Sequence, residues 1–565
     1  MASTFSAYYI GKSGIQAAQY NLKITGQNMA NVNTDGYTRQ RVDSFAVGSS
    51  GNNMRYSNKT DLAIGGGVES TGISQLRDPY LDVRYRMEHA KTGETGTELT
   101  TLNDLQSIFD EINKDGINSQ FTDLVKQLNK LAATPSDTGL ENIVKNSSLL
   151  LTKAFNNAAQ QVSKIRAQTL DSFQKDSVNK VNTLLQNIAH INQEIKSADV
   201  SETPALELTD QRNAMLDELS QYVNIQVSTK PVSVGAGRSV DELSVDLVTA
   251  ANKKINLISN GTYNQFDLKK AADGTTQDGT VQKGPATIQL KDAFGNEIMD
   301  TSKTPATPLL SNSDVTSGSF GGYLSMLNDS GEFDAKAAVA ANPPTVPVAI
   351  PAVAPTTRGI GYYNKILDTL ASKFAEMMNR ANSTNPEIDS VTNLPTIPNK
   401  PLFTALDGVT TTGITADNIS ISSAWNNATG TFITATKNET LPGVDNSKAG
   451  KNILYMVNQF NKETTFKANE GTADETTLFT SSINSFVSNI STTLGLQIDT
   501  LGKQNDTYAS TLSDIDTHRA AISSVDVNEE GINLIMYNQA LSASSRFMTT
   551  MDEAIDTIIN KMGVG

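Results

Sequence analysis

The sequence predicts a multidomain α+β protein: a long helical bundle or coiled-coil stem built from both terminal regions, with inserted β-rich domains. Three observations lead to this prediction. Both ends of the chain carry heptad patterns, long internal stretches space their apolar residues by three and four, and two further stretches alternate apolar with polar residues. A chain of 565 residues is also too long for a single core, so we expect two to four domains.

Apolar residues recur every seven positions near both ends of the chain. Helices with such stripes bury them only against each other or against another chain, and an ordinary helix pair within one chain remains the simpler alternative. Small or polar seam residues such as Gly11, Thr25 and Ser544 favour burial among several neighbours, as do outer faces rich in Asn, Gln, Ser and Thr. The predicted assembly contacts are Tyr8, Ile15, Ala18, Leu22, Met29 and Val32 at the front and Leu534, Tyr537, Leu541, Met548, Met551, Ile555, Ile558 and Met562 at the back.

A turn follows the first stripe. Asn33 and the Asp35-Gly36 pair tolerate positive φ, so residues 31–40 should end the first helix. On composition alone this stretch is a helix end followed by a turn. Residues 41–74 are rich in Gly, Ser and Asn, and we expect them to be irregular and partly extended.

From about residue 78 to residue 223 the apolar spacing is helical. Pro135-Ser136-Asp137 supplies a break and a new N-cap. No proline follows until residue 204, and this length predicts either two long antiparallel helices or one interrupted rod.

Beyond residue 223 the periodicity changes. Alternation at residues 223–227 and 243–248, with hairpin-type turns at 260–261, 273–274 and 278–279, predicts a first β-rich insert. Helical spacing returns at residues 323–327 and 362–381. A second β-rich insert follows, in which the single tryptophan, Trp425, should anchor the core, and from Asn452 we expect helix to the end. The predicted domains are residues 1–45 (N-terminal axial helix), 46–225 and 450–530 (helical body), 226–312 and 389–449 (β-rich inserts), 313–388 (helical return with a Pro-rich, polyproline-like surface loop at 337–355) and 531–565 (C-terminal axial helix).

The composition excludes several classes of protein. A net charge of −15 and a pI near 4.8 argue against a nucleic-acid binder, because phosphate contacts need clustered Lys and Arg. The absence of cysteine excludes disulfides and thiolate chemistry. No apolar run approaches the roughly 18 residues of a membrane helix. The N-terminus also lacks the pattern of a cleaved hydrophobic signal, so we expect neither a membrane partner nor classical secretion.

The sequence offers little that would support catalysis. His89, His190 and His518 are scattered, and we expect them to be solvated or structural. The Glu529-Glu530 pair could in principle serve glycoside chemistry, but adjacent carboxylates at a helix start are explained by capping. No nucleophile elbow, zinc helix or phosphate loop occurs. We therefore predict no catalytic, cofactor-binding or metal-binding residues and no enzyme activity.

Several segments resemble flagellar axial proteins. Residues 28–39 look like the signature shared by rod, hook and hook-associated subunits. Residues 77–86, 208–219 and 527–544 are similar to the hook-associated proteins of the hook–filament junction, and residues 319–324 add support. The chain departs from that pattern in the 337–355 loop and at Met536, where a basic residue is more usual. The motif residues that carry the signature are Asn28, Asn31, Asn33, Gly36, Tyr37 and Arg39.

The resemblance implies a structural, secreted motility protein of the bacterial flagellum, exported by the flagellar type III route. It implies a ring of copies joined by paired terminal helices, with the hook protein and a second hook–filament junction protein as neighbours and an export chaperone at the C-terminal helix. The alternatives are the hook protein or another axial subunit and, from a different class, a secreted hydrolase with axial anchoring helices. An adhesin role for the inserts is neither supported nor excluded.

Overall fold

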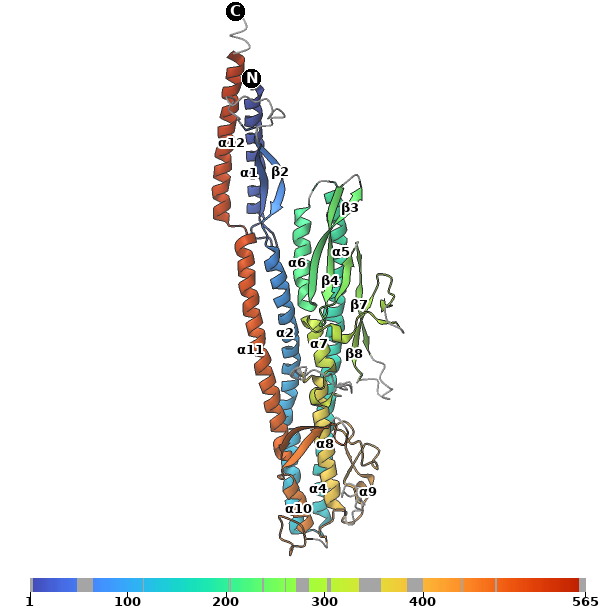
Figure 1. Cartoon of the computed structure of the whole chain (residues 1–565). Helices are drawn as coiled ribbons and strands as arrows, with labels where there is room; N and C mark the ends of the chain where they lie inside the picture. Colours follow the sequence, from blue (N-terminus) through green and yellow to red (C-terminus); the bar gives the residue numbers. More distant parts are fainter. Residues whose placement is uncertain are drawn as a thin grey trace, which may run out of the picture.

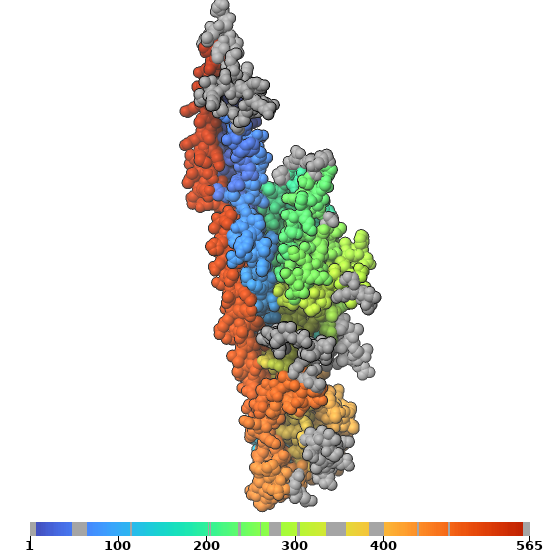
Figure 2. Space-filling model, in the orientation of Figure 1, coloured from blue at the N-terminus to red at the C-terminus, as the bar shows by residue number. Residues whose placement is uncertain are grey.

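The chain is an elongated and mostly helical molecule (Figure 1), seen here in a computed structural model. Figure 2 shows that the paired terminal helices project as a narrow extension beyond the wider body. Helix α1 begins and helix α12 ends toward the tip of this extension. The structure describes residues 4–47, 65–114, 116–201, 203, 205–235, 238–259, 261–270, 284–301, 306–334, 357–383, 400–437, 440–472 and 475–557.

Four long helices form a shaft along the molecule. They are α1 (Thr4–Ala30), α2 (Pro79–Lys114), α11 (Ile483–Ser523) and α12 (Val527–Asp556). The first and last of them pair antiparallel at the tip, and α2 packs along α11 below them (Figure 1). The chain therefore returns at its end to the place where it began, as the two heptad stripes predict.

The helical body packs beside the shaft, and its apolar residues form one continuous cluster with those of the inserts. Asp137 caps the helix that begins at Thr138 by accepting hydrogen bonds from the amides of Gly139 and Leu140, as predicted. Of the two predicted alternatives the interrupted rod is correct, because a π-helical turn joins two α-helices without a break in direction. The body helices are α3 (Ile117–Ala133), α4 (Thr138–Ser172), η1 (Phe173–Val178), α5 (Asn179–Val200) and α6 (Leu206–Tyr222).

The first insert is antiparallel throughout the part that the structure describes. Its predicted alternation is confirmed: Ile225 pairs with Leu247 and Val227 with Val245 in the main sheet. The predicted turns at 273–274 and 278–279 lie outside the described residues, as does Asn260 of the third turn. The strands are β3 (Ile225–Gly235), β4 (Arg238–Val248), β5 (Lys254–Ser259), β6 (Thr262–Tyr263), β7 (Gln265–Lys270), β8 (Ala286–Lys291), β9 (Met299–Asp300) and β10 (Thr307–Pro308).

The chain then returns to the body and forms a second, outer unit. Trp425 is buried there, as predicted for a core anchor. Between residues 400 and 449 the described strands are only two residues long, and the Pro-rich loop at 337–355 lies outside the described residues. The elements are η2 (Asn312–Asp314), α7 (Gly318–Asn328), η3 (Gly331–Phe333), α8 (Ile360–Asn382), β11 (Phe403–Thr404), β12 (Ser420–Ile421), α9 (Ser423–Asn426), α10 (Lys451–Gln459), β13 (Thr464–Ala468) and β14 (Thr476–Ser481).

One expectation is confirmed in part and another is wrong. Residues 41–74 are partly extended, as predicted, but their described ends are regular, because β1 (Gln40–Val47) and β2 (Gly67–Gln75) pair from Gln40↔Gln75 to Val47↔Gly67. Their many Ser, Gly and Asp residues hide the alternation that marks a strand. The final block is also not helical throughout, since the β13–β14 hairpin interrupts it with residues that favour strands, among them Phe466 and Phe479.

Candidate assembly site

The two terminal helices meet along a seam of alternating three- and four-residue spacing. On α12 its half-buried residues are Tyr537, Leu541, Ser544, Met548, Met551 and Ile555. On α1 the centre is small or polar, with Gly11, Ala18 and Thr25 buried, while Ile15, Leu22 and Met29 are half-buried. Val32 is half-buried in the turn that follows α1. The structure therefore brings most of the predicted contact residues to one seam. Tyr8 and Leu534 are exposed, and Ile558 and Met562 lie outside the described residues.

The small seam residues allow α1 and α12 to approach closely. A Cβ atom placed on Gly14 would lie 2.9 Å from Oγ of Ser544. On another side of α1 the β1–β2 hairpin is attached, since the amide of Val68 donates to Oγ of Ser13 at 3.2 Å. The tip of the molecule thus consists of two closely packed helices, α1 and α12, and the β1–β2 hairpin covers one side of α1.

The signature segment forms an elbow between this tip and the body. Asn28 is buried, and its Oδ1 accepts from the amide of Gln40 at 3.0 Å and from the Tyr37 hydroxyl at 2.9 Å. Its Nδ2 donates to the carbonyl of Gln40 at 2.9 Å. Gly36 has a φ of +75°, which confirms the predicted turn. One asparagine side chain thus closes the turn, with Asn31 and the exposed Asn33 inside it.

Arg39 ties the elbow to the C-terminal half of the shaft. Its amide donates to the carbonyl of Ser523 at 2.8 Å. Its guanidinium donates from Nε to Oε1 of Glu530 and from Nη2 to Oε1 of Glu529, both at 2.7 Å. Burial opposes the charge, but the hydrogen bonds to Glu529 and Glu530 outweigh it and raise the pKa of Arg39. Asp526 is the N-cap of α12, so the two glutamates have a role beyond capping that sequence reasoning missed.

A second group of charges joins α2, α6 and α11 just below the elbow. Asp217 accepts from Nε of Arg86 at 2.7 Å and from Nη2 of Arg519 at 2.6 Å. Asp82 accepts from Nε of Arg77 at 2.6 Å and pairs with Nε of Arg519 at 3.1 Å. Three of the segments that resemble junction proteins thus meet at the same place as the signature. The residue missing from sequence reasoning is Arg519, which lies outside those segments.

The elbow is also fastened to the body through α6. The amide of Thr38 donates to Oδ2 of Asp210 at 3.0 Å, and Nε2 of Gln75 donates to the carbonyl of Leu206 at 3.1 Å. A cavity of about 720 Å³ lies beneath the signature turn, between α2, α6 and α11. His89 lines it and contacts the carbonyl of Asp217 through Nδ1 at 2.9 Å, while burial lowers the pKa of this histidine. The prediction that His89 is structural agrees with these contacts.

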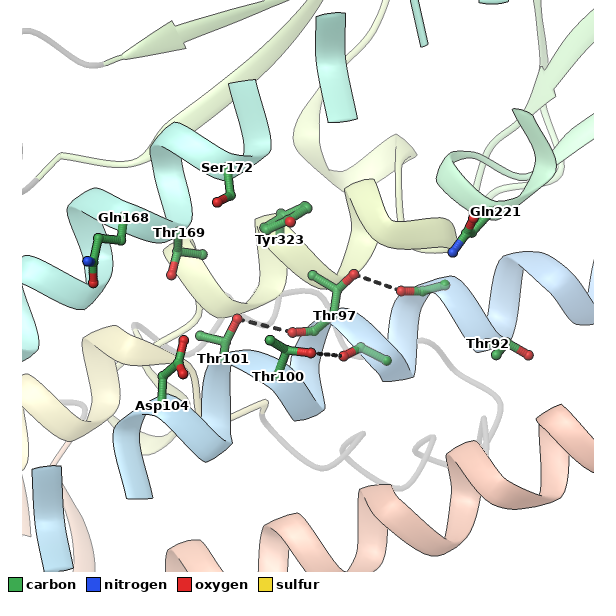
Figure 3. Close-up of a pocket in the computed structure, with 12 residues that line it drawn as sticks. Thr92, Thr97, Thr100, Thr101, Asp104, Gln168, Thr169, Ser172, Gln221 and Tyr323 are labelled. Atoms are coloured by element: carbon green, nitrogen blue, oxygen red, sulfur yellow. Dashed lines mark hydrogen bonds between the residues drawn. The ribbon is translucent and has the colours of Figure 1, made fainter. Parts of the chain in front are cut away.

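A smaller cleft of about 250 Å³ opens in the body between α2, α4 and α7 (Figure 3). Its α2 wall presents Thr97, Thr100 and Thr101, whose hydroxyls donate to carbonyls four residues earlier at 2.8, 2.8 and 3.1 Å. Tyr323 and Gln168 lie on the other walls. These hydroxyls are engaged within the helix, and the lining contains no histidine.

No set of three or more His, Asp or Glu side chains is placed to hold a metal ion within the described ranges. No helix in the same part of the chain is both long enough and apolar enough to cross a membrane. The residues that stand out are therefore those of the tip and the elbow.

Comparison with known proteins places this architecture in a class. Residues 9–38, which form most of α1 and of the elbow, match the family model described as flagella basal body rod protein. Paired termini joined to a body by this segment define a structural subunit of the bacterial flagellum. Residues 102–393, more than half of the chain, match the model described as flagellar hook-associated protein FlgK helical domain, and the chain belongs to that family.

Curated relatives carry the same description. The chain is 24% identical over 579 residues to flagellar hook-associated protein 1 of Bacillus subtilis strain 168, with 100% of both chains covered. It is 25% identical over 227 residues to flagellar hook-associated protein 1 of Escherichia coli strain K12, with 39% of each chain covered. The flagellar hook junction protein FlgK from Burkholderia pseudomallei superimposes with a TM-score of 0.39 and 20% identity over 57% of this chain and 46% of that one.

Proposed function

We propose that this chain is a non-enzymatic subunit of the junction between hook and filament and that it assembles through its paired terminal helices. The observation that carries this proposal is the tip itself. The α1–α12 pair projects beyond the body, and it keeps apolar side chains in water on the faces away from its seam. Tyr9, Tyr20, Ile532 and Ile535 are large examples.

Exposed apolar side chains on a slender helix pair are unfavourable in free energy while the chain is a monomer in water. They become favourable when neighbouring copies pack together and bury them. Burying one such side chain fully contributes about 1.5–3 kcal/mol. Contiguous patches of this kind mark contact surfaces. The elbow supports the same function, because Arg39 and Asn28 fix how the tip leaves the body and neighbouring tips can then pack in register.

The mechanism is that of an adaptor. A ring of copies packs its tips inside the flagellar tube, the helical body forms the next shell, and the inserts face outward. One end of the ring meets the hook protein and the other end meets a second junction protein. The chain reaches this extracellular position through the flagellar type III route, and an export chaperone covers α12 beforehand.

Removing the chain after Leu534 tests this proposal in a flagellated strain that lacks its own copy. We expect the truncated chain to appear in the medium, to sediment as a folded monomer and to be absent from hook ends labelled with antibody. The full-length chain and a variant with the outer substitution Leu406→Ser are the controls that should be incorporated. Incorporation of the truncated chain at hook ends would contradict the proposal.

A further inference from the structure

The first turns of α2 carry an exposed apolar stripe. Tyr80 is 68% exposed, Val83 47% and Met87 50%. Their spacing of three and four residues puts them on one face of the helix, over a length of about 10 Å. The other face is fixed in place by the buried Asp82 and Arg86, so α2 cannot roll to hide the stripe. These three residues are called the α2 stripe below.

The first turns of α12 carry a second stripe. Ile532 is 67% exposed, Ile535 60% and Met536 50%. The opposite face of α12 is held by the buried Glu530 at the elbow and by the seam that begins at Tyr537. This helix is therefore also fixed about its own axis, with Ile532, Ile535 and Met536 in water. These residues are called the α12 stripe.

The two stripes lie on opposite sides of the elbow along the long axis. From the elbow α12 runs toward the tip, whereas α2 runs away from it beside α11 (Figure 1). The stripes therefore point away from the same joint along different helices. A neighbouring copy shifted along the shaft can bring one stripe against the other.

We propose that the α2 stripe of one copy packs against the α12 stripe of its neighbour, and this inference rests on the proposed function. Because the two patches differ, the contact is head-to-tail, and repetition closes it into a ring or extends it as a helix. The α12 stripe is part of the exposed apolar surface of the tip, which makes a second copy the fitting partner.

The charges beside the stripes favour this pairing over contact between like stripes. Arg84 lies beside the α2 stripe, and its guanidinium carbon is 5.9 Å from the centre of the Tyr80 ring. Glu529 lies one turn before Ile532 on the same face of α12 and is 55% exposed beside its pairing with Arg39. An α2-to-α12 contact brings opposite charges together, whereas an α2-to-α2 contact would place arginine against arginine.

Cysteine cross-linking tests the contact cleanly, because the native chain contains no cysteine. The double variant Val83→Cys with Ile535→Cys is expressed in place of the wild-type chain, and flagella are isolated and oxidised. We expect a ladder of disulfide-linked multimers on non-reducing gels, since each copy carries one half of two contacts. Each single variant, and the matched double variant Leu496→Cys with Ile535→Cys, should give no ladder. Leu496 is exposed on α11, away from both stripes.

A charge variant supplies an independent readout. We expect Val83→Asp to lower incorporation at hook ends about tenfold while the midpoint of thermal unfolding of the purified chain stays unchanged. Incorporation of the double cysteine chain without a ladder, or normal incorporation of Val83→Asp, would overturn the contact and leave the proposed function standing. Absence of the wild-type chain from hook ends would overturn the proposed function and this inference with it.

Discussion

Gly11 lies directly against Met548 across the seam of the terminal helices. A Cβ atom on Gly11 would fall 2.6 Å from Sδ and 2.9 Å from Cγ of that methionine. The absence of a side chain at Gly11 therefore makes room on α1 for the side chain of Met548. The small seam residues, from which the sequence predicts burial among several neighbours, lie where α1 and α12 of the same chain meet.

Replacing Gly11 with leucine should separate the tip without unfolding the body. Forcing a side chain into a filled site costs about 1–3 kcal/mol. We expect faster amide hydrogen exchange in α1 and α12, and unchanged exchange in α4 and α5. The matched control is Gly26→Leu on the same helix, because no heavy atom of the described chain lies within 4 Å of the Cβ position there. Equal exchange in the two variants would contradict this account of the seam.

Arg39→Met should loosen the elbow. Glu530 is only 2% exposed, and loss of one partner from a buried pair costs about 3–5 kcal/mol. Calorimetry should show a lower midpoint of thermal unfolding or a separate early transition of the tip. The control Arg41→Met removes an exposed pair with Asp43, worth about 0–1 kcal/mol, and should leave the thermogram unchanged. Arg39→Lys should fall between the two variants, because a lysine cannot hold both carboxylates in fixed geometry.

The heptad pattern was enough to predict the pairing of the termini but not the edges of the seam. A straight α-helix drifts by about 20° per heptad relative to a strict repeat of seven. Near the start of α12 Leu534 is exposed, whereas its neighbour Asn533 is half-buried. On α1 the larger residues Ile15, Leu22 and Met29 are half-buried, while the smaller Gly11, Ala18 and Thr25 are buried.

The ion pairs at the elbow could not be predicted from the sequence. Arg39 was identified from its segment, but its partners Glu529 and Glu530 follow about 490 residues later, and no local pattern links them. The same holds for Arg519, which meets Asp217 about 300 residues away. Local rules of periodicity and turn chemistry predict elements, whereas ion pairs between elements depend on the packing of the whole chain.

Stability should fall as the pH rises from about 5 to about 8. The pKa of Glu94 is raised to about 7, mainly by burial and to a smaller extent by the nearby charge of Glu98. Burial raises the pKa of Glu98 as well. The neighbouring helix α7 carries no charged residue to offset them. The pKa of Asp329 is raised to about 6, mainly by burial and to a smaller extent by the nearby charge of Asp334.

The sign follows from the direction of these shifts. Carboxyls whose pKa is higher in the folded chain bind more protons there, so their stabilising contribution is complete below the ordinary glutamate and aspartate values. It is lost as the pH passes through about 6 for Asp329 and about 7 for Glu94. Thermal unfolding across this range measures the effect. Glu94→Gln should flatten the profile and raise the midpoint at pH 8, and Glu463→Gln on the exposed surface should not. A profile that rises with pH would contradict the assignment.

Glu141 should hold the outer unit against the body. Its Oε1 accepts from the Trp425 indole at 3.1 Å and from the amides of Phe432 and Ile433 at 2.8 and 3.2 Å. Glu141→Ala leaves three donors without this partner, and each buried donor left unpaired costs about 1–3 kcal/mol. Because Trp425 is the only tryptophan, its fluorescence reports this site alone.

We expect the Trp425 emission to shift to longer wavelength and acrylamide quenching to increase in Glu141→Ala, with the circular dichroism of the long helices retained. Glu141→Gln keeps a carbonyl oxygen that can accept from the same donors, so its emission should stay near that of the native chain. Glu376→Ala, a substitution on α8 that leaves these three donors paired, is the control for loss of a glutamate elsewhere. Unchanged emission and quenching in Glu141→Ala would mean that packing around Trp425, rather than the buried carboxylate, fixes the outer unit to α4.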